Sequence, residues 1–111
     1  MQVKVYHTAF EQTPKHIATV AAPEDCGSAA SAAEYAYRWT QNIMDSWSKN
    51  MPADGNDRVT VVEPLYVDDK GNEWGHRSSA MGDFFEVDGT LYKCAAVGFE
   101  PAEKIVCGQP F

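Results

Sequence analysis

The segment from His76 to Asp83 contains the residue types that catalyse acyl transfer. His76, two serines (Ser78 and Ser79) and Asp83 lie close together in the sequence. A serine nucleophile needs a histidine base, a carboxylate that orients the base and an oxyanion hole, and no local spacing defines this arrangement. The chain contains no G-x-S-x-G elbow, P-loop or H-E-x-x-H motif. We therefore expect no catalytic residue; the alternative is an enzyme whose deep polar pocket joins His76 to Asp83.

The cysteines and the acidic turn at residues 68–72 do not match a known ligand pattern. Cys26, Cys94 and Cys107 include no C-x-x-C pair. An odd number of cysteines is untypical of a secreted disulfide scaffold and fits a reducing cytosol, although one bridge stays open as an alternative. The turn superficially resembles a calcium loop but lacks the alternating acidic ligands and the distal glutamate. We expect no metal and no other cofactor.

The acidic residues are concentrated in one third of the chain. The 111 residues include 16 Asp+Glu and 9 Lys+Arg, a net charge of -7. Residues 54–88 contain nine acidic and three basic residues, so they account for six of those negative charges. This excess argues against a nucleic-acid-binding protein, which would carry a basic patch. Two interpretations remain: the acids are ordinary solvated turn residues, or they form a surface complementary to a basic partner.

Aromatic residues and one arginine accompany these acids. Tyr66, Trp74, His76 and Arg77 lie in the same turn-rich segment, and Trp, Tyr and Arg dominate the binding energy of protein interfaces. The alternative for Trp74 is that it covers one end of the core. Charge and residue type together predict a partner-binding surface that contains Asp54, Asp57, Asp68, Asp69, Glu73, Trp74, Arg77, Asp83, Glu86 and Asp88.

The elements that position these residues are mostly strands. Val3 and Val5 alternate with polar residues, which is the pattern of a half-buried strand. Asp88-Gly89 is a strong signal for a hairpin turn, and residues 68–72 predict a second turn, between short segments at 65–67 and 73–74. The predicted strands cover residues 1–10, 16–22, 58–62, 83–87, 90–97 and 104–107.

The clearest helical signal lies between residues 29 and 48. Ser31 and Glu34 match a capping box, although Ser28 could start the helix one turn earlier. Apolar residues recur at three- and four-residue steps, which predicts a face that packs on a sheet; they are Ala32, Tyr35, Ala36, Trp39, Ile43 and Trp47. The sequence therefore predicts a single α+β domain over residues 1–111. One antiparallel sheet of about four to six strands would carry one helix, at about 29–48, on one face.

The chain also lacks the segments that direct proteins to membranes or for export. No apolar run approaches the roughly 20 residues that span a bilayer, and the first residues have no apolar signal-peptide core. We therefore expect a cytoplasmic protein with no membrane partner.

The stretch from Arg77 to Phe99 resembles a module found in mobile elements. It contains Arg77-Ser78, then Gly82-Asp83, a strand, Gly89, a strand that includes Tyr92, and Gly98-Phe99. This pattern is similar to the C-terminal module of short phage and plasmid accessory proteins, including YodL-like sequences. The run 37–43, followed by Ser46-Trp47, resembles the helix end that precedes this module, so the resemblance spans residues 35–99. Ala80-Met81 stands where Ser-Val is more usual, which we interpret as a packing change.

The resemblance implies a phage or plasmid protein and assigns no catalytic residue. Combined with the acidic segment, it predicts a non-enzymatic inhibitor of a nucleic-acid-targeting defence complex in the host cytoplasm, of the anti-CRISPR or anti-restriction type. The partner would be a nuclease or surveillance subunit with a basic nucleic-acid-binding surface, and the protein would not bind nucleic acid directly. The alternative is a housekeeping accessory protein, or a homo-oligomeric adaptor such as a homodimer that uses exposed sheet edges.

Overall fold

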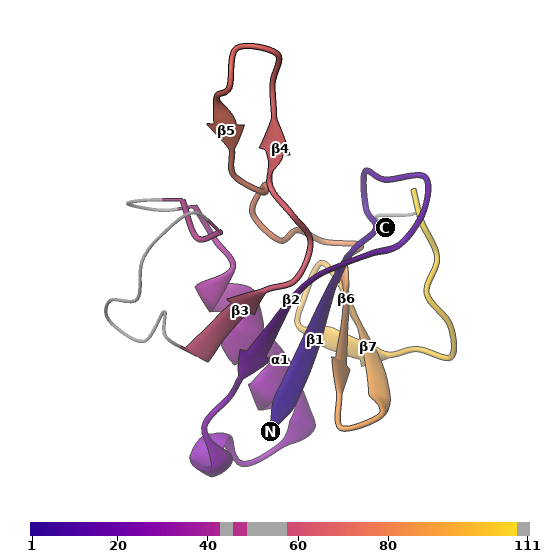
Figure 1. Ribbon diagram of the computed structural model, residues 1–111. Helices are drawn as coiled ribbons and strands as arrows, with labels where there is room; N and C mark the ends of the chain where they lie inside the picture. The colour runs from indigo at the N-terminus through magenta and orange to yellow at the C-terminus, as the bar shows by residue number, and fades with distance from the viewer. Residues whose placement is uncertain (43–45, 49–57, 109–111) are drawn as a thin grey trace.

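The computed structural model describes residues 1–42, 46–48 and 58–108, in which one α-helix packs on one main sheet (Figure 1). The main sheet has six strands in the order β3-β2-β1-β6-β7-β8, and every neighbouring pair is antiparallel. This confirms the predicted α+β fold with a single main sheet. The strands are β1 (Gln2–His7), β2 (Lys15–Ala21), β3 (Val59–Val61), β6 (Phe84–Val87), β7 (Thr90–Cys94) and β8 (Phe99–Pro101).

Strand β1 lies at the centre of the sheet and forms an antiparallel hairpin with β2. Val3 pairs with Val20 of β2 on one side and with Val87 of β6 on the other. Val3, Val5 and Val20 are completely buried, because alternate residues of a strand point to the same face and this face meets the helix. The apolar alternation therefore marks the face of the sheet that forms the core.

The β6–β7 hairpin also forms as predicted. Its turn residues, Asp88 and Gly89, have φ angles of 48° and 89°. Positive φ at both central residues is what a two-residue hairpin turn of type I′ requires, and Asp-Gly adopts it readily. Strand β7 ends at Cys94, earlier than predicted, because the Ala95 N–H turns back to the Gly98 carbonyl at 2.9 Å.

The helix α1 (Ala29–Trp39) is shorter than the predicted 29–48. It begins at the alternative cap, Ser28, whose Oγ accepts a hydrogen bond from the Ser31 N–H at 3.1 Å. It ends because the Thr40 hydroxyl donates to the Ala36 carbonyl at 2.9 Å and the Thr40 N–H donates to the Tyr37 carbonyl. A 3-10 turn, η1 (Glu24–Cys26), precedes the helix.

Small residues let the helix approach the sheet closely. Ala32, Ala33 and Ala36 are the buried residues of α1, and they pack with the valines of the sheet and with Phe85. Trp47, which was predicted to extend the helical stripe, is buried outside the helix in a second cluster with Ile17 and Ala18. Ile43 lies outside the described residues.

The predicted strand at 104–107 is wrong. The last strand of the described residues is β8, which ends at Pro101. The Ala102 N–H bonds the Leu91 carbonyl at 2.9 Å, and the Gly108 N–H bonds the Thr8 carbonyl at 2.9 Å. The chain thus leaves the edge of the sheet and returns to the end of β1.

The strands β4 (Tyr66–Val67) and β5 (Glu73–Trp74) form a separate hairpin, which confirms the turn predicted at 68–72. In Figure 1 this hairpin projects from the upper end of the main sheet. We call residues 63–75 the arm. The arm interrupts the connection between β3 at one edge of the sheet and β6 near its centre.

Candidate protein-binding site

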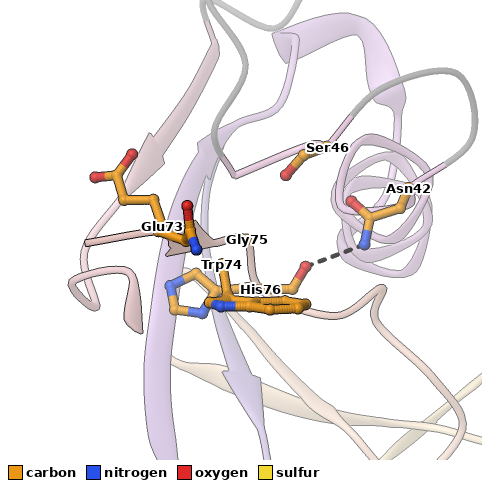
Figure 2. A pocket seen from close by; sticks show the side chains of 7 residues that line it. Asn42, Ser46, Glu73, Trp74, Gly75 and His76 are labelled. Carbon is orange, nitrogen blue, oxygen red and sulfur yellow. Dashed lines mark hydrogen bonds between the residues drawn. The ribbon is translucent and has the colours of Figure 1, made fainter. Parts of the chain in front are cut away.

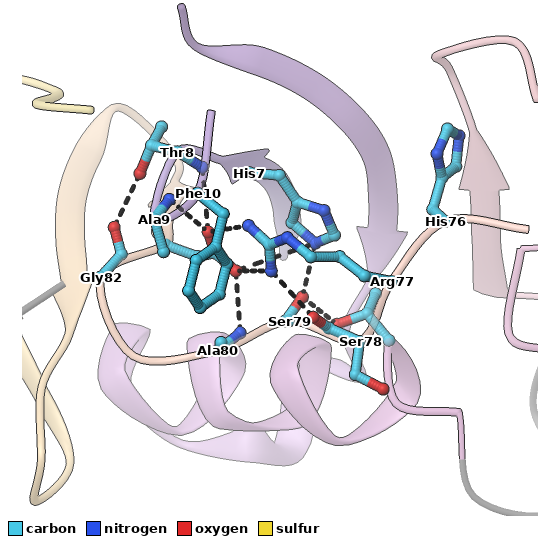
Figure 3. A network of polar contacts seen from close by, with 12 residues as sticks. His7, Thr8, Ala9, Phe10, His76, Arg77, Ser78, Ser79, Ala80 and Gly82 are labelled. Carbon is cyan, nitrogen blue, oxygen red and sulfur yellow. Dashed lines mark hydrogen bonds and ion pairs between the residues drawn. The ribbon is translucent and has the colours of Figure 1, made fainter. Parts of the chain in front are cut away.

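A buried ion pair between Arg77 and Asp83 anchors the loop that follows the arm (Figure 3). The guanidinium donates to both carboxylate oxygens of Asp83, at 2.7 and 2.8 Å. The same carboxylate accepts hydrogen bonds from the N–H groups of Thr8, Ala9 and Ala80, at 2.9, 3.0 and 2.8 Å. Burial alone would raise the pKa of Asp83, but Arg77 and these N–H groups lower it below its usual value.

Arg77 also holds the loop that follows β1. Its Nε and Nη2 donate to Glu11 at 3.2 and 2.9 Å, and its guanidinium lies 5.0 Å from the centre of the Phe10 ring. Burial acts to lower the pKa of Arg77, but the hydrogen bonds to Asp83 and Glu11 raise it above its usual value. Two carboxylates thus balance the arginine charge. Arg77 and Asp83, both predicted as partner-binding residues, are bonded to the chain itself.

A chain of hydrogen bonds joins β1 to the end of the helix behind this ion pair. His7 Nε2 lies 3.0 Å from Ser79 Oγ, and Ser79 Oγ lies 2.7 Å from Thr40 Oγ1. Because Thr40 donates to a carbonyl, Ser79 must donate to Thr40, and His7 Nε2 must carry the hydrogen. Burial lowers the pKa of His7 to about 4 despite the nearby Asp83, so its ring is neutral at pH 7.

This arrangement differs from a catalytic triad. In a triad the histidine accepts from the serine and the carboxylate bonds its other ring nitrogen, whereas here Asp83 Oδ2 lies 3.9 Å from the same Nε2 that contacts Ser79. Ser79 and Asp83 are both buried. His76 points elsewhere, since its Nε2 donates to the Glu63 carbonyl at 2.8 Å. The described residues therefore place His76 and Asp83 in separate surroundings, contrary to the pocket that the enzyme alternative needs.

Contacts around His76 hold the base of the arm. The His76 N–H donates to Ser48 Oγ at 2.7 Å, and the Asn42 side chain donates to the His76 carbonyl at 3.0 Å (Figure 2). The ring of Trp47 lies 6.0 Å from the ring of His76, and its indole N–H donates to the Arg77 carbonyl at 2.9 Å. Together with the bond to Glu63, these contacts fix where the arm leaves the body of the protein.

Asp68 organises the turn of the arm. One carboxylate oxygen accepts the N–H groups of Lys70 and Asn72 at 2.9 and 2.8 Å, and the other accepts the indole N–H of Trp74 at 3.1 Å. These bonds, that from Trp74 foremost, lower the pKa of Asp68. Its carboxylate is therefore used to shape the turn and to orient the indole, which explains why a turn with the composition of a calcium loop forms a hairpin.

The arm exposes two aromatic side chains that face each other across its strands. Tyr66 pairs with Trp74, and their side chains are 66% and 60% exposed. The alternative that Trp74 covers the core is therefore wrong. Trp74 lines two clefts, of about 370 and 360 Å³. Figure 2 shows the indole edge-on in the first cleft, with Asn42 and Ser46 on one side of its plane.

The predicted acidic residues do not gather on one face. Asp68, Asp69 and Glu73 belong to the arm. Glu86 and Asp88 lie on β6 and its turn, at the opposite end of the sheet in Figure 1, where they line another cleft together with Lys4. Asp83 is buried, and Asp54 and Asp57 lie outside the described residues. The acids that share a surface with exposed aromatic side chains are those of the arm.

Sequence reasoning missed several residues that support this site. Three of them, Thr8, Glu11 and Thr40, bond residues of the 76–83 loop, which lies far from them in the sequence. No local sequence pattern marks such contacts. His7 lies on the same face of β1 as Val3 and Val5, so the alternation of that strand agrees with its burial.

The structure shows where the cysteines lie within the described part of the chain. Cys26, Cys94 and Cys107 are all free, and burial raises the pKa of Cys94 to about 11. No group of three or more His, Cys, Asp or Glu residues in ranges 1–42, 46–48 and 58–108 could hold a metal ion. No helix of these ranges is long and apolar enough to cross a membrane. No family model matches the chain, and no curated protein or solved structure shows significant similarity to it.

Proposed function

We propose that this chain is a non-enzymatic binding protein that docks the arm on a basic surface of a partner protein. The observation that carries the proposal is the exposed pair Tyr66 and Trp74 on a projecting hairpin. Exposed aromatic rings make unfavourable contact with water and contribute little to the core. The same residue types supply most of the binding energy when a partner covers them.

The arm is organised before it binds. Asp68 fixes the orientation of the Trp74 indole, and His76 closes the base of the arm on Glu63. Side chains that are already held in one conformation lose less entropy on association, so more of their contact energy appears as affinity. A rigid aromatic surface therefore supports a role in binding better than a role as a solvated loop.

The charge of the arm favours a basic partner. Residues 63–75 include four acidic residues and one lysine, and complementary charge accelerates encounter and excludes wrong partners. The arm replaces the whole acidic segment, 54–88, as the proposed docking surface. Glu86 and Asp88 would take no part in docking, because they lie at the other end of the sheet.

The partner we propose is a nuclease or surveillance subunit of a host defence complex in the cytoplasm, which the protein would inhibit by covering a nucleic-acid channel. Two observations support this choice: the acidic arm, and the resemblance of residues 35–99 to a module of phage and plasmid proteins. A channel that binds the phosphate backbone is lined by Lys and Arg, which is the surface that the arm complements.

The proposal is tested by phage plating on cells with active CRISPR or restriction systems. Expression of the wild-type protein should raise the efficiency of plating, and the double variant Tyr66→Ser/Trp74→Ser should lose most of this effect. Val97→Ser is the matched control, because Val97 is 90% exposed but lies on the β7–β8 turn. Inhibition that survives the double variant, or no inhibition by the wild type in any system, contradicts the proposal.

The homo-oligomeric alternative rests on the two edges of the main sheet. β3 and β8 each have one unpaired side in the strand order, but each is three residues long, and Pro101 interrupts the donors of β8. Light scattering on the purified protein separates the two functions: a stable dimer that persists in Tyr66→Ser/Trp74→Ser would favour the adaptor.

A further inference from the structure

The second cleft beside Trp74 combines aromatic walls with an available carboxylate. It has a volume of about 360 Å³, and Tyr66 and Trp74 form the wall that belongs to the arm. Lys15 and Ile17 of β2 also line it, as does Glu63 at the base of the arm. A space of this size accepts a long side chain or a small ligand.

Of the two carboxylates that line this cleft, Glu63 is the one whose side chain has no partner among the described residues. Its backbone is engaged, since its N–H bonds Ile17 and its carbonyl accepts from His76, but its side chain forms no hydrogen bond or ion pair with any residue in 1–42, 46–48 or 58–108. Glu11, the other carboxylate lining the cleft, is bonded to Arg77. An incoming cation would therefore meet Glu63 first.

The chemistry of the cleft distinguishes between the two basic side chains. A guanidinium is planar, so it can stack on an indole or phenol ring while its paired N–H groups bond a carboxylate. A lysine ammonium is a strongly hydrated point charge and cannot form both contacts with the same geometry. Attraction between a cation and an aromatic face adds to the affinity where water is excluded.

We propose that this cleft binds the guanidinium of an arginine of the partner, stacked against Tyr66 and Trp74 and paired with Glu63. The inference rests on the proposed function, because the arginine would belong to the basic surface on which the arm docks. Two cations of the chain, Lys15 and Arg77, also line the cleft. The charge of Arg77 is balanced by Asp83 and Glu11, whereas Lys15 opposes the binding of any cation and so limits the affinity.

The test compares two peptides of equal charge, Ac-(Gly-Arg)4-NH2 and Ac-(Gly-Lys)4-NH2. Binding to the full chain is followed by NMR through the indole N–H signal of Trp74, assigned with Trp74→Phe. The arginine peptide should bind about fivefold more tightly than the lysine peptide, which corresponds to one additional stacking contact. Equal affinities would mean that charge alone attracts the peptides, and they would overturn the inference.

Three variants locate the interaction. Glu63→Gln should lower the affinity for the arginine peptide by about five- to tenfold. It should also remove most of the difference in affinity between the arginine and lysine peptides. Glu86→Gln is the matched control, since it removes the same charge at the other end of the sheet, and it should leave both affinities unchanged. Lys15→Gln should tighten both peptides by about two- to threefold. Equal effects of Glu63→Gln and Glu86→Gln would overturn the proposed position of the arginine.

The plating assay separates this inference from the proposed function. A protein that inhibits defence through Tyr66 and Trp74 but binds both peptides equally would overturn the arginine site alone. A protein that prefers the arginine peptide in a Glu63-dependent way but has no effect on plating would overturn the inhibitory function and leave the arginine site in place.

Discussion

Arg77 connects its own loop, which includes Asp83, to the distant segment that follows β1. It bonds Asp83 with two hydrogen bonds, bonds Glu11 with two more, and accepts the ring of Phe10 against its guanidinium. A planar, forked cation suits this position because lysine has neither the geometry nor the number of donors. The residue that appeared from its type to be an interface arginine is instead the centre of an internal network.

Replacement of Arg77 should show how much this network contributes. Arg77→Met leaves the fully buried Asp83 charge without its main partner, and we expect a loss of about 3–5 kcal/mol in the free energy of unfolding. Arg77→Lys keeps the charge and should lower the free energy of unfolding by less than Arg77→Met does. Urea denaturation measures both variants. Glu11→Gln, at the partly exposed side of the network, is the control and should cost less than about 1 kcal/mol. A value for Arg77→Met close to that control would contradict the structural role.

Elements whose shape depends on local contacts, such as the arm, could be predicted from the sequence, whereas elements that depend on distant residues could not. The turn of the arm was predictable because Asp68, Gly71 and Asn72 act on their own neighbours. The end of α1 was not predictable, because the chain turns away where Thr40 meets Ser79, thirty-nine positions along. The β8 strand was missed for a similar reason: its pairing with β7 depends on the turn at Gly98, and the apolar run that follows it has no pairing partner among the strands.

Removal of the arm should separate binding from stability. Replacing residues 66–74 with Asn-Gly closes the hairpin at its base, and we expect the free energy of unfolding to change by less than about 1 kcal/mol, because the deleted aromatic side chains are exposed. Inhibition of defence should disappear. Urea denaturation and the plating assay give the two readouts. A shortened protein that fails to fold would show that the arm is part of the core.

At the scale of the whole molecule, the exposed acids of segment 54–88 that the structure describes are divided between two ends of the sheet. The arm holds one group of acids, and the β6–β7 turn with Glu86 holds another. The sequence shows that the acidic residues are concentrated in 54–88, but the fold of the chain decides which of them share a surface. Strand order could not be predicted either, because the pairing of β1 with β6 joins positions more than seventy residues apart.

Stability of the whole fold should decrease in acid. The pKa of His7 is 6.5 in an unfolded chain and about 4 in the folded one, so between these values only the unfolded chain binds the proton. The contribution of neutral His7 to the free energy of unfolding is therefore fully present above pH 6.5. The free energy of unfolding falls by about 3 kcal/mol as the pH drops to 4. Asp83, whose folded pKa is lowered, adds a further loss at lower pH.

His7→Gln provides the control for this prediction. The amide can still donate to Ser79 but does not titrate, so the variant should be less stable than the wild type at pH 7 and should show a flatter profile between pH 6.5 and pH 4. Urea denaturation at a series of pH values measures both proteins. The same slope in the variant and the wild type would show that His7 is not the group responsible.

The position of the arm in the chain has a consequence for how such a protein can change. The arm is inserted between an edge strand and a central strand, and the ladders of β3 and β6 fix both ends of that connection. Lengthening a connection whose ends are fixed costs free energy only as the logarithm of its length. New tips can therefore replace the old one while the sheet keeps its sequence, so a lineage facing a changing set of targets could acquire new specificities without having to evolve a new fold.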